Sequence, residues 1–212
     1  MTTLYFSPGA CSFAAHVLLE ELGAPYDTVR VSVAPQDQEQ RKPEYLAVNP
    51  RARVPALAIA DEILTESPAI LAHLADNQPQ AQLLPPPGSL PRARADEWMS
   101  FLSSTVHIAF AHLFRPERYA DEATAKDEMK RKARSTIEHV LADIEGHLPA
   151  EGFALGRYSA IDPYLFVFYR WSKLNGFDTA LTPKYRALAG RVLERPAVQR
   201  VFEQEKLPAF AV

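Results

Sequence analysis

Residues 4–12 read LYFSPGACS, a run of strand-forming residues followed by a turn and a cysteine. The first three residues predict a short β-strand, and the SPG that follows predicts a turn. Helix-forming residues then occupy positions 12–22 and end at Gly23, because a glycine is typical of a helix C-terminus. Residues 26–33 alternate valine with other residue types and predict a second strand. Two strands joined by a helix pair in parallel through a right-handed crossover, so the chain is expected to begin with an α/β unit.

The rest of the chain divides at a proline-rich stretch. Short apolar runs at 54–59 and 62–64 predict an antiparallel hairpin, which makes the sheet mixed, and residues 67–76 predict a helix. Four prolines lie within residues 83–91, where they favour an extended path. Everything after this stretch has helical periodicity, over 92–114, 123–148, 159–175, 183–194 and 197–205. We therefore predict an α/β domain (1–80), a linker (81–91) and an all-helical domain (92–212).

Composition excludes several classes of function. The 212 residues are 47% hydrophobic and 23% charged, which is typical of a globular protein with a sizeable core. The net charge of −3 argues against a nucleic acid partner, and no apolar run approaches the roughly 18 residues of a membrane span. The first residues do not resemble a secretory signal, so a cytoplasmic location is expected. The single cysteine, Cys11, excludes an intrachain disulfide, and His107 and His112 are spaced five apart, which does not predict a metal site.

Cys11 lies between a predicted strand end and a predicted helix start. Free backbone N–H groups and the helix dipole at such a position stabilise an anion, so the position suits a thiolate. A free cysteine is equally often a small buried apolar side chain. Its position alone does not separate these two interpretations.

Two further motifs each admit a functional and a structural interpretation. A predicted helix begins at Glu66, Ser67 and Pro68, and in the structural interpretation Ser67 is its N-cap. In the functional interpretation Glu66 binds the amino group of a ligand, while Ser67 and the helix N-terminus bind the carboxylate of that ligand. The bond between Val54 and Pro55 is expected to be trans on frequency alone. If it is cis, Val54 turns its N–H and C=O toward Cys11 and can pair with a ligand backbone.

His107 lies within the first long helical segment, on the face of Ser100, Ser103 and Ser104. That face is opposite an apolar stripe. An isolated histidine in a helix is most often a surface residue or a core residue whose ring nitrogens are hydrogen-bonded. The stripe is predicted to contain Trp98, Phe101, Leu102 and Thr105. A separate SAID motif at 159–162 has the spacing of a capping box and is predicted to be structural.

Taken together, these motifs resemble a cytosolic glutathione transferase over nearly the whole chain. The resemblance lies in YFSPGACS at 5–12, KPEYLAVNP at 42–50, VPAL at 54–57, TESPAI at 65–70 and the box that ends at Asp162. The early cysteine and His107 resemble the bacterial beta class. The resemblance implies a thioredoxin-like first domain, an all-helical second domain, a homodimer and glutathione as co-substrate between the domains. It also implies a cis bond before Pro55.

The resemblance further implies roles for individual residues. Val54 would pair with the cysteinyl backbone of glutathione, Glu66 and Ser67 would hold its γ-glutamyl end, and Cys11 and His107 would approach its sulfur. The helix-borne Ser104 and Thr105 are expected to add contacts, with Ser100 at the position that a partner subunit reaches. The chain departs from the class pattern in lacking lysines beside this site. Ile108 and Ala52 replace a common lysine and a common glycine, and Gln36 stands near the position where a lysine often meets the glycyl carboxylate of glutathione. Two cationic contacts are thus expected to be missing, and Arg53 or Arg51 is expected to compensate for them.

The implied activity is attack of the glutathione thiolate on a hydrophobic electrophile, after the site has lowered the pKa of that thiol. A thiol-exchange or peroxidase activity through a mixed disulfide on Cys11 is a second chemistry. The alternatives are a glutathione-dependent dehalogenase or isomerase, and a non-catalytic adaptor with the same fold. The residues expected to line the electrophile pocket are Ala10, Phe13, Phe110, Phe114 and Tyr164.

Overall fold

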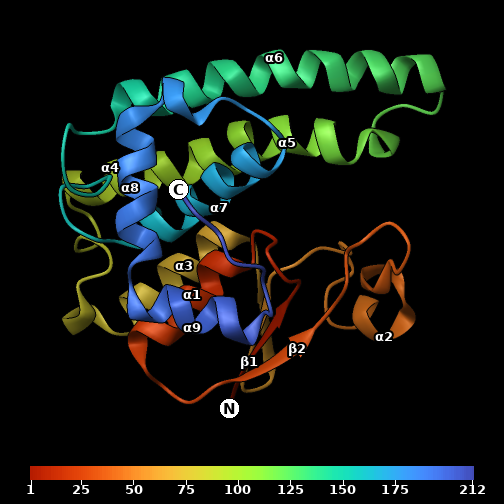
Figure 1. The fold of residues 1–212 in the computed structure, drawn as a ribbon. Helices are drawn as coiled ribbons and strands as arrows, with labels where there is room; N and C mark the ends of the chain where they lie inside the picture. The colour runs from red at the N-terminus through yellow and green to blue at the C-terminus, as the bar shows by residue number, and fades with distance from the viewer.

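Four strands form one mixed sheet in the computed structural model, which describes all residues, 1–212 (Figure 1). They lie in the order β2-β1-β3-β4 and comprise β1 (Thr2–Phe6), β2 (Asp27–Arg30), β3 (Ala56–Ile59) and β4 (Glu62–Thr65). Strand β2 runs parallel to β1, whereas β3 is antiparallel to both β1 and β4. The parallel unit and the hairpin predicted from the sequence are both confirmed.

Nine α-helices accompany the sheet, three before the proline-rich stretch and six after it. The first three are α1 (Phe13–Leu22), α2 (Pro43–Leu46) and α3 (Ser67–Asp76). The others are α4 (Leu90–Phe101), α5 (His107–Phe114), α6 (Ala123–His147), α7 (Ile161–Leu174), α8 (Pro183–Leu193) and α9 (Pro196–Gln204). None of these helices combines the length and the apolar character that crossing a membrane requires.

Helix α1 ends as its sequence predicts, but the strand after it is shorter than predicted. Gly23 adopts a left-handed φ of 65° and donates its N–H to the carbonyl of Leu19, which closes the helix. Strand β2 stops at Arg30 because the loop that follows captures the backbone. The N–H of Ser32 donates to the Glu39 carboxylate at 2.6 Å, and its hydroxyl donates to a carboxylate oxygen of Asp37 at 2.6 Å.

The first long helical segment differs from its prediction at its start and in its middle. Helix α4 begins at Leu90, inside the predicted linker, because the Ser89 hydroxyl accepts the N–H of Arg92 as an N-cap. A π-helical turn over Leu102–Val106 then separates α4 from α5. Such a turn inserts an extra residue and rotates the helical face that follows. Thr105 is therefore exposed, and its predicted place in the apolar stripe is wrong.

Helix α7 begins at the predicted capping motif. The Asp162 carboxylate accepts the backbone N–H of Ser159 at 2.7 Å and the Ser159 hydroxyl at 2.9 Å. Its other oxygen accepts the N–H of Ala154 at 2.9 Å. Burial raises the pKa of this carboxyl to about 6, although the three donors oppose that shift. The motif is structural, as predicted.

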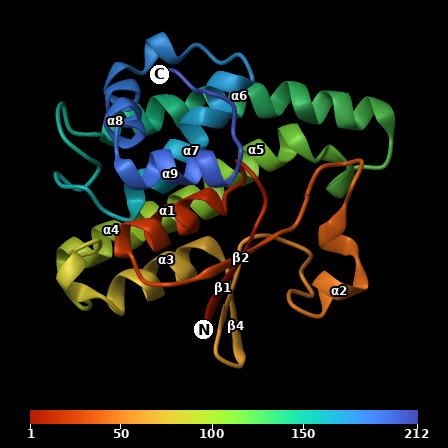
Figure 2. The same ribbon diagram turned by 60° about the horizontal axis from the view of Figure 1, so that its bottom comes forward.

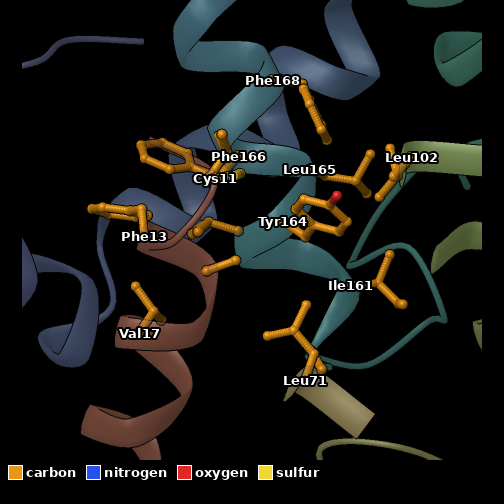
Figure 3. Packing of buried hydrophobic residues seen from close by; sticks show 14 of the residues in the cluster. Cys11, Phe13, Val17, Leu71, Leu102, Ile161, Tyr164, Leu165, Phe166 and Phe168 are labelled. Atoms are coloured by element: carbon orange, nitrogen blue, oxygen red, sulfur yellow. The ribbon is translucent and has the colours of Figure 1, made fainter. Parts of the chain in front are cut away.

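One continuous core joins the strand-containing part of the chain to the helical part. A single cluster of 43 buried residues spans both, and α1 packs against α7 and α9 (Figure 2). Phe13 of α1 contacts Phe166 of α7 and Phe202 of α9, with ring centroids 5.8 and 5.5 Å apart. Figure 3 shows side chains of α1 and α7 facing each other in this core. Helix α7 is buried along nearly its whole length, so the loop before α1 has a fixed neighbour in the helical part.

Candidate functional site

A cavity of about 200 Å³ lies where the loop before α1, the loop before β3 and the start of α3 face helices α5 and α7. Its walls bring together six of the residues predicted from the sequence to form the site. These are Cys11, Arg53, Val54, Glu66, Ser67 and His107. They come from four separate segments of the chain, so the site exists only in the folded molecule.

Cys11 is a buried thiol that donates a hydrogen bond to the carbonyl oxygen of Val54, with Sγ 3.2 Å away. Burial raises the pKa of this thiol to about 11, although the Ser67 hydroxyl and the nearby backbone N–H groups lower it. Desolvation therefore outweighs the favourable position at a helix start. Cys11 is therefore neutral at pH 7, which favours the interpretation as a buried thiol over the interpretation as a thiolate.

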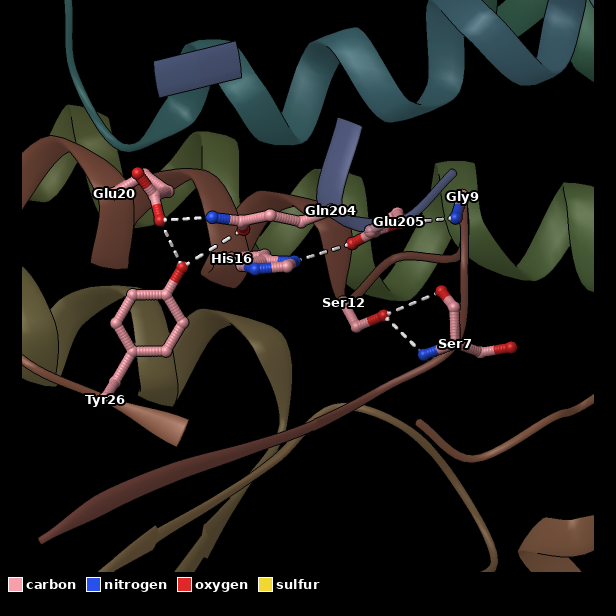
Figure 4. A network of polar contacts seen from close by, with 8 residues as sticks. All are labelled: Ser7, Gly9, Ser12, His16, Glu20, Tyr26, Gln204 and Glu205. Carbon is pink, nitrogen blue, oxygen red and sulfur yellow. Dashed lines mark hydrogen bonds and ion pairs between the residues drawn. The ribbon is translucent and has the colours of Figure 1, made fainter. Parts of the chain in front are cut away.

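The loop that carries Cys11 is held internally by one serine. The hydroxyl of Ser12 accepts the N–H of Ser7 at 3.1 Å and donates to the Ser7 carbonyl at 3.2 Å. Figure 4 shows this pair directly below the start of α1. Because both serines are buried, these bonds satisfy groups that water does not reach.

The same loop is anchored to the helical part of the protein through Gly9. Its N–H donates to Glu205 Oε2 at 2.7 Å, and its carbonyl accepts Trp171 Nε1–H at 2.9 Å. The other oxygen of Glu205 accepts His16 Nδ1–H at 2.9 Å, and both of these side chains are almost fully buried (Figure 4). Gly9 has a φ of 66°, and a Cβ there would lie 2.6 Å from the Arg170 guanidinium. The left-handed φ therefore favours glycine at this anchor point, and a larger residue would also displace the Arg170 side chain.

The peptide bond between Val54 and Pro55 is cis, as the resemblance implied and against the frequency argument. The Tyr45 hydroxyl and the Asn49 side-chain amide both donate to the carbonyl of Arg53, at 2.6 and 2.7 Å, and hold this loop. The backbone N–H of Val54 makes no hydrogen bond within the protein and lies on the cavity wall. It is therefore available to an extended ligand backbone.

Glu66 and Ser67 both line the cavity at the start of α3. The helix begins at Ser67, and Glu66 precedes it with a φ of 73°, so the prediction of Ser67 as the N-cap is wrong by one residue. Neither side chain caps the helix. Glu66 is exposed and makes no ion pair, whereas the Ser67 hydroxyl faces the Cys11 thiol and the Tyr164 hydroxyl. These observations argue against helix capping as the role of Glu66 and Ser67 and favour the interpretation that they bind a ligand.

His107 is the first residue of α5, directly after the π-helical turn, and it is half-buried on the cavity wall. Its ring packs edge-on against Phe168 and Trp171, with centroids 5.8 and 5.5 Å apart. Burial lowers the pKa of His107 to about 4, and the positive charges of Arg53 and Arg118 lower it further. The imidazole is therefore neutral at pH 7.

The remaining predicted site residues lie outside the cavity of this chain. Gln36 lies on an exposed loop, and Ser100, Ser104 and Thr105 lie on the exposed side of α4 and the π-helical turn. The Ser104 hydroxyl donates to the Ser100 carbonyl at 2.7 Å. Arg51 also points elsewhere, since its guanidinium donates to the Thr65 hydroxyl at 3.2 Å.

Three of the five residues predicted to line the electrophile pocket lie on the cavity wall. Ala10, Phe114 and Tyr164 line the cavity. Phe13 and Phe110, by contrast, are buried in the core, and their prediction as pocket residues is wrong. Both pack against aromatic side chains of α7, Phe13 against Phe166 and Phe110 against Phe168. An apolar residue in a helix gives no signal that separates core from pocket.

Comparison with known proteins identifies the family. Residues 1–76 match the family model described as "Glutathione S-transferase, N-terminal domain". Over 206 residues the chain is 34% identical to glutathione S-transferase GstA of Escherichia coli O157:H7, covering 96% of this chain and 98% of the relative. The chain belongs to the glutathione S-transferase family.

Solved structures agree with this assignment. A glutathione transferase homologue from Sulfitobacter, crystallised with bound glutathione, superposes with a TM-score of 0.91 at 37% identity and covers 98% of this chain and 99% of its own. A bacterial beta class glutathione S-transferase from Sphingomonas chungbukensis gives a TM-score of 0.85 at 38% identity, with 97% and 100% covered. The thioredoxin-like first part and the all-helical second part are thereby confirmed.

In this glutathione S-transferase, sequence reasoning missed part of the cavity wall. Ser103 lines the cavity in place of its neighbour Ser104, because the π-helical turn shifts the face of the helix. Arg115 and Arg118 line it from the segment after α5, and Trp171 lines it from α7. The two arginines lie in the sequence FRPER at 114–118. This sequence predicts a charged loop, but it does not predict that the arginine side chains line the cavity.

Proposed function

We propose that this protein conjugates the thiolate of glutathione to electrophilic small molecules. The observation that supports this proposal is the convergence, in one cavity, of a free Val54 N–H, an unpaired Glu66 carboxylate and a neutral His107 imidazole. Each of these groups lacks an internal partner that would explain its position. Membership of the glutathione S-transferase family supplies the substrate that fits them.

Glutathione is a tripeptide with one ammonium and two carboxylates, and the cavity offers a group for each. The Glu66 carboxylate suits the ammonium of the γ-glutamyl residue, while the Ser67 hydroxyl and the start of α3 suit its carboxylate. Val54 pairs with the cysteinyl backbone, and Cys11 releases the Val54 carbonyl as this happens. Arg53, next in the chain to Val54 and on the same wall, suits the glycyl carboxylate.

These contacts direct the glutathione sulfur toward Cys11 and His107. A neutral imidazole with a pKa near 4 is a weak base, so His107 acts as an N–H donor to the developing thiolate. The guanidinium groups near His107 add positive charge that favours an anion. Lowering the thiol pKa by two units requires about 3 kcal/mol of preferential stabilisation of the anion, which one charge-assisted hydrogen bond and these charges can supply.

The state of Cys11 favours conjugation over the mixed-disulfide chemistry. Ionising a thiol with a pKa of about 11 at pH 7 costs about 5 kcal/mol, so Cys11 is a poor nucleophile in this environment. Its neutral S–H can instead donate a hydrogen bond to the glutathione sulfur once the Val54 carbonyl is engaged. Thiol exchange is then a minor activity of the same site.

A second copy of the chain is proposed to cover the outer side of α4 and the π-helical turn. Ser100, Ser104 and Thr105 are exposed there, beside the cavity but outside it. Ile108, one residue after His107, is 37% exposed and also lines the cavity. A homodimer would bring these residues near the glutathione site of its own subunit or of the partner. Light scattering at micromolar concentration is expected to give twice the mass of one chain.

The test of the proposed function uses the full-length protein on immobilised glutathione, followed by a conjugation assay with 1-chloro-2,4-dinitrobenzene. We expect retention, elution by free glutathione and a conjugation rate above the uncatalysed reaction. A folded protein that neither binds nor conjugates would favour the adaptor. Conjugation confined to one class of electrophile would favour a specialised dehalogenase or isomerase.

A further inference from the structure

Three arginines line the same cavity, and none of them makes an ion pair within the protein. Arg53 comes from the loop before β3, whereas Arg115 and Arg118 come from the segment after α5. No salt bridge involves any of the three. The only carboxylate on the cavity wall is that of Glu66. The cavity thus carries an excess of positive charge in a protein whose net charge is −3.

These cations are held in place at some electrostatic cost. Arg115 is half-buried, and its Nη2 donates to the carbonyl of Val33 at 2.7 Å, across the boundary between the helical part and the α/β part. Burial lowers the pKa of Arg118, and the charges of Arg53 and Arg115 lower it further. Three like charges that share a cavity with a single carboxylate, that of Glu66, repel each other, so a bound anion relieves this repulsion.

Glutathione alone does not account for all three cations. In the proposed binding mode its γ-glutamyl carboxylate goes to Ser67 and the start of α3, and its glycyl carboxylate goes to Arg53. Arg115 and Arg118 remain, on the part of the wall formed by the segment after α5. Their neighbours there are the apolar and aromatic side chains of Ile108, Phe114 and Tyr119.

We propose that the acceptor substrate of this enzyme is an electrophile with an apolar or aromatic body and an anionic group, most simply a carboxylate, which Arg115 and Arg118 bind. This inference rests on the proposed glutathione conjugation. The planar guanidinium matches a carboxylate in a bidentate manner, which selects for an anion and orients it. The reactive carbon of the acceptor then faces the sulfur between Cys11 and His107.

The chemical step balances without any further reactant. With a chloroaromatic acid, the thiol of glutathione loses its proton to solvent, and the sulfur forms a bond to the ring carbon that bears chlorine. The carbon–chlorine bond breaks, and chloride leaves with the electron pair. The carboxylate of the acceptor stays on the arginines throughout and takes no part in bond making.

The test compares two acceptors that differ only in charge, 4-chloro-3,5-dinitrobenzoate and 4-chloro-3,5-dinitrobenzamide. For each acceptor, kcat/KM is divided by the uncatalysed rate constant, which removes the difference in intrinsic reactivity. We expect the ratio of benzoate to benzamide to be about 10 for the wild type and to fall about tenfold in Arg118→Gln, as the loss of one charge-assisted contact predicts. The matched control is Arg30→Gln, since Arg30 is exposed on β2, away from the cavity, and should leave both activities unchanged.

Two outcomes would overturn the proposal. A wild-type ratio near 1 would show that the cavity does not select for an anion. A rise in the KM for glutathione in Arg118→Gln, with the ratio between acceptors unchanged, would assign Arg118 to the glycyl carboxylate of glutathione instead.

Calorimetric binding of the unreactive pair 3,5-dinitrobenzoate and 3,5-dinitrobenzamide separates this proposal from the proposed function. If the protein binds the benzoate preferentially and loses that preference in Arg118→Gln but conjugates neither chloro compound, the anion site stands and conjugation fails. If it conjugates 1-chloro-2,4-dinitrobenzene but binds both unreactive ligands equally, conjugation stands and the anion site fails.

Discussion

Glu205→Gln is expected to destabilise the protein and to loosen the loop that carries Cys11. The two carboxylate oxygens of Glu205 accept Gly9 N–H and His16 Nδ1–H at 2.7 and 2.9 Å, and the residue is only 3% exposed. A glutamine in the same place has one acceptor oxygen and one NH₂ group. Either one of the two donors then loses its partner, or the His16 proton moves from Nδ1 to Nε2, a buried nitrogen that has no hydrogen-bond partner and becomes an unsatisfied donor. A buried donor left unsatisfied costs about 1–3 kcal/mol, and the NH₂ group facing that donor adds to this cost.

We therefore expect Glu205→Gln to lower the free energy of unfolding by about 3 kcal/mol. The assay is urea unfolding at one fixed protein concentration, because association of two chains would make stability depend on concentration. The matched control is Glu203→Gln, two residues earlier on α9, where the carboxylate is exposed and makes no bond; its effect should stay within about 0.5 kcal/mol.

The variant should also lose activity, because Gly9 fixes the loop position relative to α7 through Trp171. We expect kcat/KM with 1-chloro-2,4-dinitrobenzene to fall about tenfold, which corresponds to about 1.4 kcal/mol. A double-mutant cycle with His16→Phe should give a coupling energy of about 1–2 kcal/mol between the two side chains. An unfolding free energy for Glu205→Gln within 1 kcal/mol of the wild type would show that this anchor is not needed.

Three further predictions concern the cavity. Glu66→Ala and Ser67→Ala should each raise the KM for glutathione about tenfold and change kcat less than threefold, because they bind a remote part of the substrate; an unchanged KM in both would remove the assignment. Cys11→Ala should abolish thiol exchange but leave the conjugation rate within about threefold of the wild type. Because the pKa of Cys11 is about 11, the rate at which iodoacetamide modifies wild-type Cys11 should rise about tenfold per pH unit from pH 7 to pH 10. A modification rate that reaches a plateau near pH 8 would contradict that pKa. The native pKa of His107 is about 4, below the ordinary 6.5, so below pH 6.5 the unfolded chain binds a proton that the native protein does not. The contribution of His107 to stability is therefore present in full above pH 6.5 and is lost progressively toward pH 4. Between pH 7 and pH 4.5 it lowers the free energy of unfolding by about 2.5 kcal/mol. Urea unfolding of His107→Asn should show a drop in the free energy of unfolding over this pH range that is about 2.5 kcal/mol smaller than the drop in the wild type.

Local sequence was sufficient for most of the secondary structure. The β1 turn, the Gly23 terminus of α1, the hairpin of β3 and β4 and the extent of α3 all follow from short-range rules of turn chemistry and periodicity. The capping motif at Ser159 and Asp162 was recognisable for the same reason. These features depend on residues a few positions apart, so their signals lie within one segment.

The errors at this level come from interactions that cross segments. Strand β2 ends early because the loop after it captures its backbone, and the π-helical turn before His107 removes Thr105 from the apolar stripe. Phe13 and Phe110 have the residue type of a pocket wall, but their neighbours on other helices bury them. A helical pattern predicts which face of the helix is apolar, but it does not predict whether that face packs against another helix or lines a cavity.

The chemistry of the site depended still more on tertiary structure. Residue types and turn positions were enough to single out Cys11, Glu66 and Ser67 as candidates, whereas His107 became one only through the resemblance to the glutathione transferases. The protonation states of Cys11 and His107 were not predictable, because desolvation is the sum of contributions from many residues that approach from distant segments. The same holds for the arginine cluster: nothing in FRPER at 114–118 indicates that its two arginines line the same cavity as Arg53. Charge and burial act through space, and the order of residues along the chain does not contain those distances.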